Sequence, residues 1–222
     1  MTEQKIYDYI IIGGGSAGLA SAIYAGRARM DVLLIEGALP GGEAARTDII
    51  ENYPGFPDAV QGPELMELFK KQAEKFGTVF DMGEILKIET DGDVKILTKD
   101  DGTKLRTYAV LIGTGTSHLH LNAPGEKEFA GRGVSYCATC DGAFFRDVPI
   151  AVVGGGDSAL DEGLFLTRFG KKVYIIHRRD ELRATKILQE RALADPKMEI
   201  IYNSVVEEII GDKLVKAIKL KK

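Results

Sequence analysis

The stretch that decides the fold is KIYDYIIIGGGSAGLASAIYAGRARMDVLLIE, residues 5–36. Its apolar beginning predicts a strand, GGGSAG a tight turn, LASAIYAGRA a helix and DVLLIE a second strand. A strand, turn, helix and strand of this length form a βαβ unit with a right-handed crossover. The uncharged run 9–26 fits this unit better than a membrane span, because three consecutive glycines interrupt it.

The turn in this unit has the pattern G-x-G-x-x-G, which is typical of dinucleotide-binding loops. Its first glycine makes the turn, the second lets the backbone approach a pyrophosphate, and the third lets helix and strand pack closely. The helix start offers unpaired N–H groups to phosphates, and the glutamate that ends the second strand can accept a hydrogen bond from a ribose hydroxyl. The alternative is a structural turn beside a surface glutamate. The predicted cofactor contacts are Gly13, Gly15, Ser16, Ala17, Gly18 and Glu36.

The same pattern returns in residues 148–180, VPIAVVGGGDSALDEGLFLTRFGKKVYIIHRRD. Here basic residues follow the second strand, where the first unit has its glutamate. Guanidinium groups bind a 2′-phosphate in a bidentate manner, whereas a carboxylate repels it, so this site is expected to prefer NADPH to NADH. A solvated basic helix start is the alternative. The predicted contacts are Gly154, Gly156, Asp157, Ser158, Ala159, His177, Arg178, Arg179 and Arg183.

The remaining pattern completes an α/β fold. A helix is predicted from Pro63 to Gly77, an antiparallel meander over 84–113, a helix over 180–194, and strands from 197 onward. We expect two Rossmann-like nucleotide-binding domains of the three-layer ββα type, the first with the meander as an insert. The Gly- and Pro-containing stretch 113–125 is the expected boundary, which gives domains 1–115 and 116–222.

Composition narrows the function. The 222 residues carry a formal net charge of −4, which gives no reason to expect nucleic acid or a membrane as a partner. Two cysteines cannot form a disulfide framework, and MTEQKIYD has no visible leader, so a cytoplasmic protein is expected.

Both cysteines lie in SYCATCDGAF, residues 135–144, as Cys137 and Cys140. A structural zinc site needs four ligands, and the chain has no second pair and no histidine spacing of a finger, so no metal site is expected. A C-x-x-C pair can close a short disulfide and lower the pKa of one thiol. Asp141 either exchanges a proton with the adjacent sulfur or only forms an Asp-Gly turn. Phe144 and Phe145 either dock a protein partner or pack inward.

Taken together, these motifs resemble the low-molecular-weight thioredoxin reductases. CATCDG lies between GGGSAG and GGGDSA, with ENYPG before it and HRRDELRA after it, and the resemblance covers essentially the whole chain. It implies FAD in the first domain, NADPH and the disulfide in the second, thioredoxin as the protein substrate, and a homodimer. By the same resemblance Cys140 faces the flavin, Cys137 attacks thioredoxin and Asp141 is the acid. The implied flavin contacts are Gly41, Gly42, Glu43 and Asn52.

The chain departs from this family at two places. Position 43 is commonly glutamine in the family, and a carboxylate there is expected to lower the flavin potential by disfavouring the anionic reduced ring. Family members also continue beyond KLVKAIKLKK to finish the FAD domain, so a C-terminal truncation is expected. The expected function is NADPH- and FAD-dependent reduction of a protein disulfide. The alternatives are the same chemistry on another acceptor and a catalytically impaired nucleotide-binding fragment.

Overall fold

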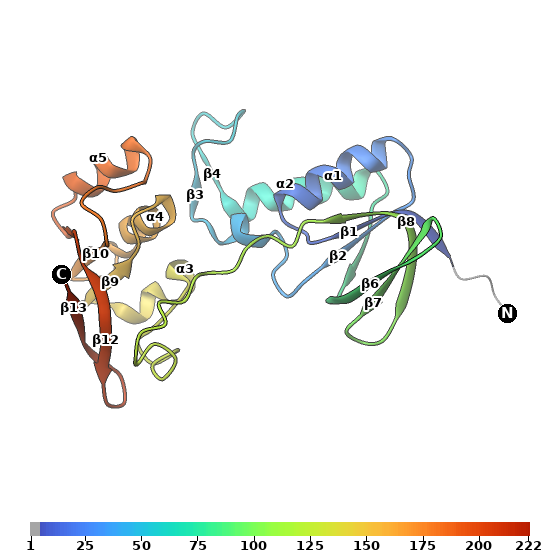
Figure 1. Cartoon of the computed structure of the whole chain (residues 1–222). Helices are drawn as coiled ribbons and strands as arrows, with labels where there is room; N and C mark the ends of the chain where they lie inside the picture. Colours follow the sequence, from blue (N-terminus) through green and yellow to red (C-terminus); the bar gives the residue numbers. More distant parts are fainter. Residues whose placement is uncertain (1–4) are drawn as a thin grey trace. The chain divides into compact units, whose positions relative to one another are not determined.

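A computed structural model describes residues 5–222, and the chain divides into two compact units, the first ending at Ser117 and the second beginning at His118 (Figure 1). No helix within residues 5–222 has the length and apolarity needed to cross a membrane.

The first unit is built on a six-stranded sheet with the order β5-β2-β1-β8-β7-β6. Its strands are β1 (Ile6–Ile12), β2 (Val32–Glu36), β5 (Val79–Met82), β6 (Ile85–Asp91), β7 (Val94–Lys99) and β8 (Lys104–Ile112). The first four in the order run parallel, and β6 and β7 are antiparallel, joined by the predicted meander turns. Strand β5 was not predicted, because its four residues show no period.

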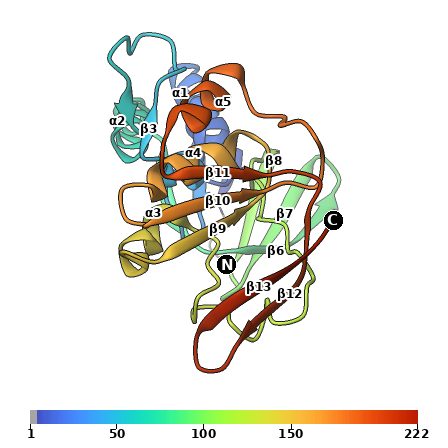
Figure 2. The same cartoon turned by 90° about the vertical axis from the view of Figure 1, so that its left-hand side faces the viewer.

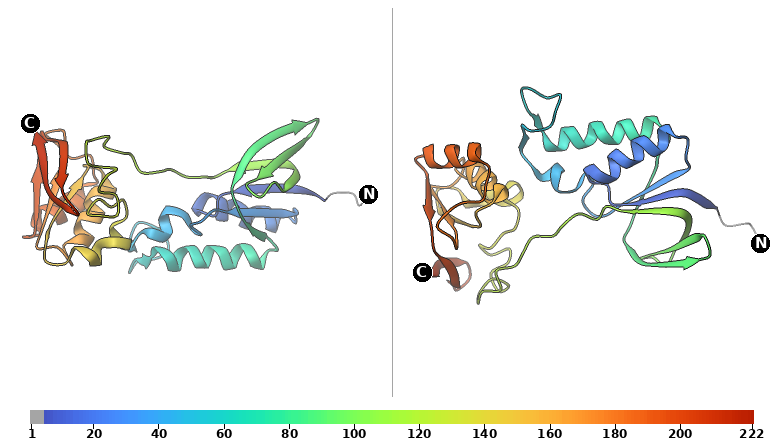
Figure 3. Two further views of the ribbon diagram at one scale, coloured as in Figure 1. Left: turned by 90° about the horizontal axis from the view of Figure 1, so that it is seen from below. Right: turned by 45° about the horizontal axis from the view of Figure 1, so that its top comes forward.

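Helices α1 (Ser16–Arg27) and α2 (Gly62–Lys75) lie side by side over one face of β1 and β2 (Figures 1 and 3). On that face Ile11 and Leu34 pack with Leu19 and Leu65. On the opposite face the fully buried Leu97 of β7 packs against the alternate residues of β1 and β2. The order of layers is therefore helix, sheet, folded-over ribbon, which confirms the predicted three-layer fold class.

Between β2 and α2 the chain forms a short helical turn η1 (Gly42–Arg46) and the paired strands β3 (Ile49–Ile50) and β4 (Val60–Gln61). The second unit holds a parallel sheet in the order β11-β10-β9 and a separate hairpin of β12 and β13 (Figure 2). Its elements are α3 (Ala138–Asp141), η2 (Gly142–Phe145), β9 (Pro149–Val153), α4 (Asp157–Leu166), β10 (Lys172–Ile176), α5 (Lys186–Ala194), β11 (Met198–Ile201), β12 (Val205–Gly211) and β13 (Val215–Lys221).

The helix predicted over 180–194 begins only at Lys186. Residues 180–185 form a turn instead, because the backbone N–H groups of Arg183 and Ala184 donate to the Gly155 carbonyl at 2.7 and 3.1 Å.

A buried carboxylate anchors the start of the second unit. Glu126 is 1% exposed and accepts hydrogen bonds from the backbone N–H groups of Leu121 and Asn122 and from the Tyr136 hydroxyl, at 2.9, 2.7 and 3.0 Å. Burial raises the pKa of Glu126, but these hydrogen bonds, with one from His120, outweigh burial and leave the pKa below its ordinary value. Because Tyr136 precedes Cys137, the network fixes the entry to the cysteine segment.

Replacing Glu126 with glutamine is expected to lower the free energy of unfolding by about 2–3 kcal/mol at neutral pH, because the amide NH₂ meets donors that need an acceptor. The folded pKa is lowered, so the contribution of the carboxylate is complete above its ordinary pKa of 4.5 and is lost as the pH falls through the lowered value. Urea unfolding at several pH values should show the gap between the two proteins closing in acid. The exposed Glu128→Gln should stay within about 0.5 kcal/mol of the parent at every pH.

Candidate active site

The first glycine loop leaves one position open for a ligand. A Cβ on Gly13 would lie 2.2 Å from the Gly113 carbonyl oxygen, and one on Gly18 would lie 1.9 Å from the Gly13 carbonyl oxygen, so both are filled by the protein itself. A Cβ on Gly15 would meet only the Gly42 Cα, at 4.0 Å. Ser16 and Ala17, in the first turn of α1, are exposed beside it. This is the division of roles expected of a loop whose middle glycine admits a pyrophosphate.

Glu36 lies beneath this loop. Glu36 is 3% exposed, and its Oε1 atom has no hydrogen-bond partner within the described chain. A Cβ on Gly14 would lie 2.7 Å from that oxygen, so Oε1 is directed at the loop. A buried acceptor without a donor costs about 1–3 kcal/mol. A ribose hydroxyl placed over the loop would supply the donor, so the residues present fit the adenosine half of a dinucleotide.

A second glycine pair approaches the same loop. The Gly41 N–H donates to the Gly14 carbonyl at 3.1 Å, and a Cβ on Gly42 would lie 3.2 Å from the Gly15 Cα. Both glycines have positive φ, 81° and 63°, which side-chain-bearing residues rarely adopt. The turn of residues 41–43 is therefore held beside the loop that the sequence assigns to the cofactor, with Glu43 exposed.

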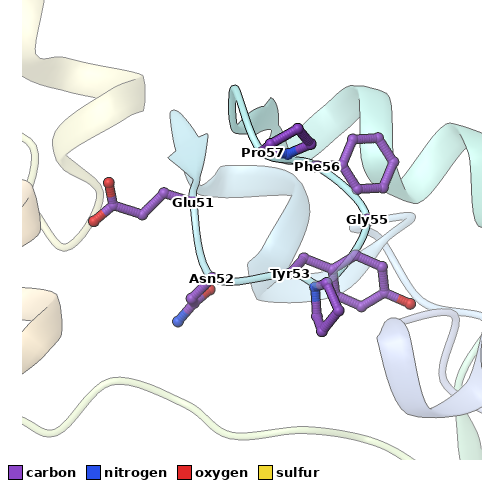
Figure 4. Close-up of a pocket in the computed structure, with 7 residues that line it drawn as sticks. Glu51, Asn52, Tyr53, Gly55, Phe56 and Pro57 are labelled. Atoms are coloured by element: carbon purple, nitrogen blue, oxygen red, sulfur yellow. The ribbon is translucent and has the colours of Figure 1, made fainter.

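Asn52 lies further along, in a hollow of about 330 Å³ lined by residues 51–57. In Figure 4 the Tyr53 and Phe56 rings lie on one side of this loop, and Glu51 and Asn52 point to the other. The Tyr53 ring packs 6.0 Å from Phe56 and 5.6 Å from Phe69 of α2, which holds the loop to the helix layer. The Asn52 amide is exposed and available to a ligand.

The second glycine loop repeats the arrangement. A Cβ on Gly154 would lie 2.8 Å from the Cβ of Ala159, whereas one on Gly156 would meet nothing within 4 Å. Beneath the loop, a Cβ on Gly155 would lie 2.3 Å from His177 Nδ1, so His177 occupies the place that Glu36 has in the first unit. His177 is 4% exposed, and its Nε2 lies 3.0 Å from the Glu181 carbonyl oxygen, which can only accept a hydrogen bond.

His177 thus supports residues 178–185, called the arginine turn because Arg178, Arg179 and Arg183 lie on it. The Asp157 carboxylate holds the same turn by accepting from the Thr185 N–H at 2.6 Å, and Ser158 beside it is exposed. The side chains of Arg178, Arg179 and Arg183 are exposed, and within residues 5–222 none of them has a hydrogen-bond or ion-pair partner. Three unpaired guanidinium groups on a turn tied to a glycine loop fit a phosphate ester next to the loop.

The two sulfurs of Cys137 and Cys140 are bonded, with 5.3 Å between the Cα atoms. Cys137 is the N-cap of α3, and its Sγ accepts a hydrogen bond from the Cys140 N–H at 3.2 Å. In the disulfide form this backbone donor is therefore directed at the Cys137 sulfur, the position in which it would stabilise a thiolate. Cys140 is the more exposed of the two, so the pair presents one stabilised and one accessible sulfur.

Ser135 is a site residue that the motif did not indicate. Its hydroxyl donates to Asp141 Oδ2 at 2.6 Å and accepts from the Cys137 N–H at 3.1 Å. It thereby fixes the Asp141 carboxylate to the backbone of the cysteine turn. The only signal in the sequence is its place two residues before Cys137, which is too common a feature to interpret.

The turn after the cysteines is held by one glycine. A Cβ on Gly142 would lie 3.1–3.3 Å from Leu166, Phe169 and Phe165, so α3 and η2 sit tightly on α4. Phe145 is half-buried, and the Phe144 side chain is 82% exposed. The inward-packing alternative therefore applies to Phe145 alone. Within residues 5–222 no cluster of three or more His, Cys, Asp or Glu could hold a metal ion.

The chain has two dinucleotide-binding folds, with a carboxyl group at the first loop and arginines beside the second, and a disulfide in the second unit. This combination defines the class of flavin- and pyridine-nucleotide-linked disulfide oxidoreductases. The chain belongs to the pyridine nucleotide-disulphide oxidoreductase family, whose model matches residues 7–222.

The relatives confirm the resemblance that the motifs indicated. The thioredoxin reductase of Listeria innocua is 50% identical over 220 residues, which are 99% of this chain and 68% of the relative. That of Streptomyces coelicolor is 46% identical over 219 residues, covering 98% of this chain and 68% of the relative. The crystal structure of Lactococcus lactis thioredoxin reductase matches with a TM-score of 0.94 and 46% identity, covering 97% of this chain and 71% of that one. The chain thus spans about two thirds of the length of these relatives.

Proposed function

We propose that the chain carries the NADPH-dependent, FAD-mediated reduction of a protein disulfide, with thioredoxin as the partner, through Cys137 and Cys140. The observation that carries the proposal is a disulfide in the same unit as three arginine side chains, in a chain whose other unit directs the Glu36 Oε1 atom at a glycine loop. Neither the three guanidinium groups nor this oxygen has a partner in the part of the chain that the structure describes. The cofactor contacts are assigned as predicted from the sequence, except that His177 supports the arginine turn. A cytoplasmic location and a homodimer are further parts of the proposal.

The residues divide the chemistry as follows. FAD held at the first glycine loop by the residues around Gly15 and Glu36 would supply, from NADPH, the electron pair that breaks the Cys137–Cys140 bond. Asp141, held by Ser135, gives a proton to the sulfur of Cys140, so that cleavage leaves one thiol and one thiolate. The Cys137 thiolate, stabilised by the Cys140 N–H, attacks the partner's disulfide and forms a mixed disulfide. Asp141 takes the proton back from Cys140, and the Cys140 thiolate attacks the Cys137 sulfur of the mixed disulfide. This restores the Cys137–Cys140 bond and releases the partner's second sulfur, and the partner's two thiolates take up one proton from Asp141 and one from solvent to give the dithiol.

Both the arginine turn and the disulfide belong to the second unit, and both must serve one flavin. Two groups of this size cannot occupy one edge of the ring at the same time. The mechanism therefore requires the second unit to alternate between two poses during turnover. The exposed Phe144, four residues after Cys140, suits an apolar contact with the incoming partner.

The test is the colour of the purified chain and its response to NADPH. A yellow protein that is bleached by NADPH without oxygen, and that then reduces thioredoxin, supports the proposal. If the yellow protein instead reduces a different disulfide, such as that of a peroxidase, then thioredoxin is the wrong acceptor and the rest of the proposal stands. A colourless protein that still binds NADPH supports a nucleotide-binding module, which is the second candidate because the chain spans about two thirds of its relatives.

The Glu43→Gln variant is expected to raise the flavin midpoint potential by about 30 mV, which is about 1.4 kcal/mol for two electrons. Removal of the carboxylate stabilises the anionic reduced ring, and the effect is moderated because Glu43 Oε1 already accepts a hydrogen bond from Arg46 at 3.2 Å. Anaerobic titration against a reference dye measures the potential. The exposed Glu64→Gln makes the same charge change on α2 and should leave the potential where it is. A potential that does not respond to Glu43→Gln contradicts the proximity of residue 43 to the flavin.

A further inference from the structure

The ion pair between Lys70 and Glu36 carries a further inference, which rests on the proposed FAD site. The Lys70 ammonium, from α2, donates to Glu36 Oε2 at 2.9 Å. The other oxygen, Oε1, is buried, has no hydrogen-bond partner among residues 5–222 and is directed at Gly14. One oxygen of the carboxylate is thus fixed by the protein, and the other is left for a ligand.

Lys70 is itself held in place. Its side chain is 29% exposed, and its Nζ lies 4.8 Å from the centre of the Phe80 ring on β5, a cation–π contact that adds to the ion pair. The hydrogen bond with Glu36 raises the pKa of the Lys70 ammonium above its ordinary value and outweighs burial, which lowers it. The lysine therefore stays charged at physiological pH and presents a fixed donor to one side of the carboxylate.

A lysine at this position has a specific effect on the geometry of the glutamate. A buried carboxylate that is not held can rotate so that neither oxygen faces the ribose. The Lys70 ammonium, 2.9 Å from Oε2, fixes the orientation of the carboxylate and leaves Oε1 directed at the loop. Sequence reasoning did not find this residue, because Lys70 precedes a second lysine in an amphipathic helix and looks like ordinary surface charge.

We propose that Lys70 is a positioning residue for the first dinucleotide site, which holds Glu36 so that Oε1 accepts a hydrogen bond from a hydroxyl of the FAD adenosine ribose. Lys70 does not touch the ligand in this arrangement. It acts on affinity and on the recognition of the ribose hydroxyl, and not on the flavin chemistry.

The experiment measures FAD binding by fluorescence quenching, and then the release of bound FAD by ADP, 2′-deoxy-ADP and 3′-deoxy-ADP. These probes share a pyrophosphate and differ only at the hydroxyls that Glu36 would read. In the parent chain, ADP is expected to displace FAD about tenfold more effectively than the analogue that lacks the contacted hydroxyl. In Lys70→Met, FAD should bind about tenfold more weakly and the preference for ADP should fall to about twofold.

Three further variants make the interpretation specific. Lys71→Met changes the neighbouring lysine, which pairs with Glu67 on the exposed face of α2, and should behave as the parent does. Lys70→Arg keeps the cation and should recover most of the ADP preference. In a Glu36→Gln background, Lys70→Met should have little added effect, because residues that act through one contact are not additive.

The outcomes separate the two proposals. A parent chain that takes up no FAD overturns both the proposed cofactor and the role of Lys70. A parent chain that binds FAD while Lys70→Met keeps the full preference for ADP overturns only the role of Lys70. Tighter FAD binding by Lys70→Met also overturns it, because the lysine would then compete with the ribose for Glu36.

Discussion

Replacing Cys137 or Cys140 with serine is expected to reduce NADPH-dependent disulfide reduction by at least about 10³-fold, because each sulfur is needed once per cycle to form or resolve a mixed disulfide. Bleaching of the flavin by NADPH should survive in both variants, since neither serine alters the glycine loops. The two activities are measured in the same preparation, thioredoxin reduction by turnover and bleaching by absorbance under anaerobic conditions.

The two serine variants should also differ from each other. In Cys140→Ser, the backbone N–H of residue 140 still points at the Cys137 sulfur, which it meets at 3.2 Å in the disulfide form. In Cys137→Ser, the remaining Cys140 has no such donor in the described structure. Iodoacetamide should therefore alkylate Cys137 about tenfold faster than Cys140 at neutral pH. Cys140 is the more exposed residue. A faster alkylation of Cys140 would therefore show that solvent access, and not stabilisation of the thiolate, determines the reactivity of the two cysteines.

The second large effect is expected at the arginine turn. Changing Arg178 and Arg179 together to glutamine should weaken binding of 2′,5′-ADP by about 10²–10⁴-fold, since each removes a charge-assisted hydrogen bond worth about 1.5–3 kcal/mol. NADH, which has no 2′-phosphate, should lose no more than about threefold in affinity. Isothermal titration calorimetry with 2′,5′-ADP measures binding at this site separately from binding at the flavin site.

Arg168→Gln provides the matched control for the arginine turn. Arg168 lies just after the end of α4, with its guanidinium 5.0 Å from the Phe165 ring, whereas the arginine turn is tied to the glycine loop at the start of that helix. It should leave the affinity for 2′,5′-ADP unchanged. Equal losses in Arg168→Gln and in the double variant would mean that the net charge of the unit attracts the ligand, without a defined phosphate site.

Much of the fold could be predicted because local patterns agree with the tertiary structure. The apolar runs of β1 and β2 flank a glycine loop, and the DG pairs that end β6 and begin the β7–β8 turn have glycines with φ of 59° and 83°. These signals need no knowledge of distant residues. Strand β5 gave no such signal, because its four residues form a strand only by pairing with β2.

The site was predictable where chemistry follows a fixed spacing, as in the glycine loops and the cysteine pair. It was not predictable where function depends on a contact across the fold. The turn at 180–185 resembles a helix start in sequence, and becomes a turn because Gly155 accepts its N–H groups. The roles proposed for Ser135 and Lys70 rest on single hydrogen bonds to Asp141 and Glu36, which no periodicity reports.

The matching places of Glu36 and His177, each beneath the middle residue of a three-glycine run, have a consequence for the cell. FAD and NADPH both contain an adenosine diphosphate half. With two similar glycine loops in one chain, the more abundant nucleotide could bind at the wrong loop. On the proposed assignment, a buried carboxyl group under one loop and a cationic turn beside the other would sort the two ligands by the substituent on the ribose. A large excess of NADP⁺ should then leave flavin uptake unaffected, and free FAD should be a poor inhibitor at the second loop.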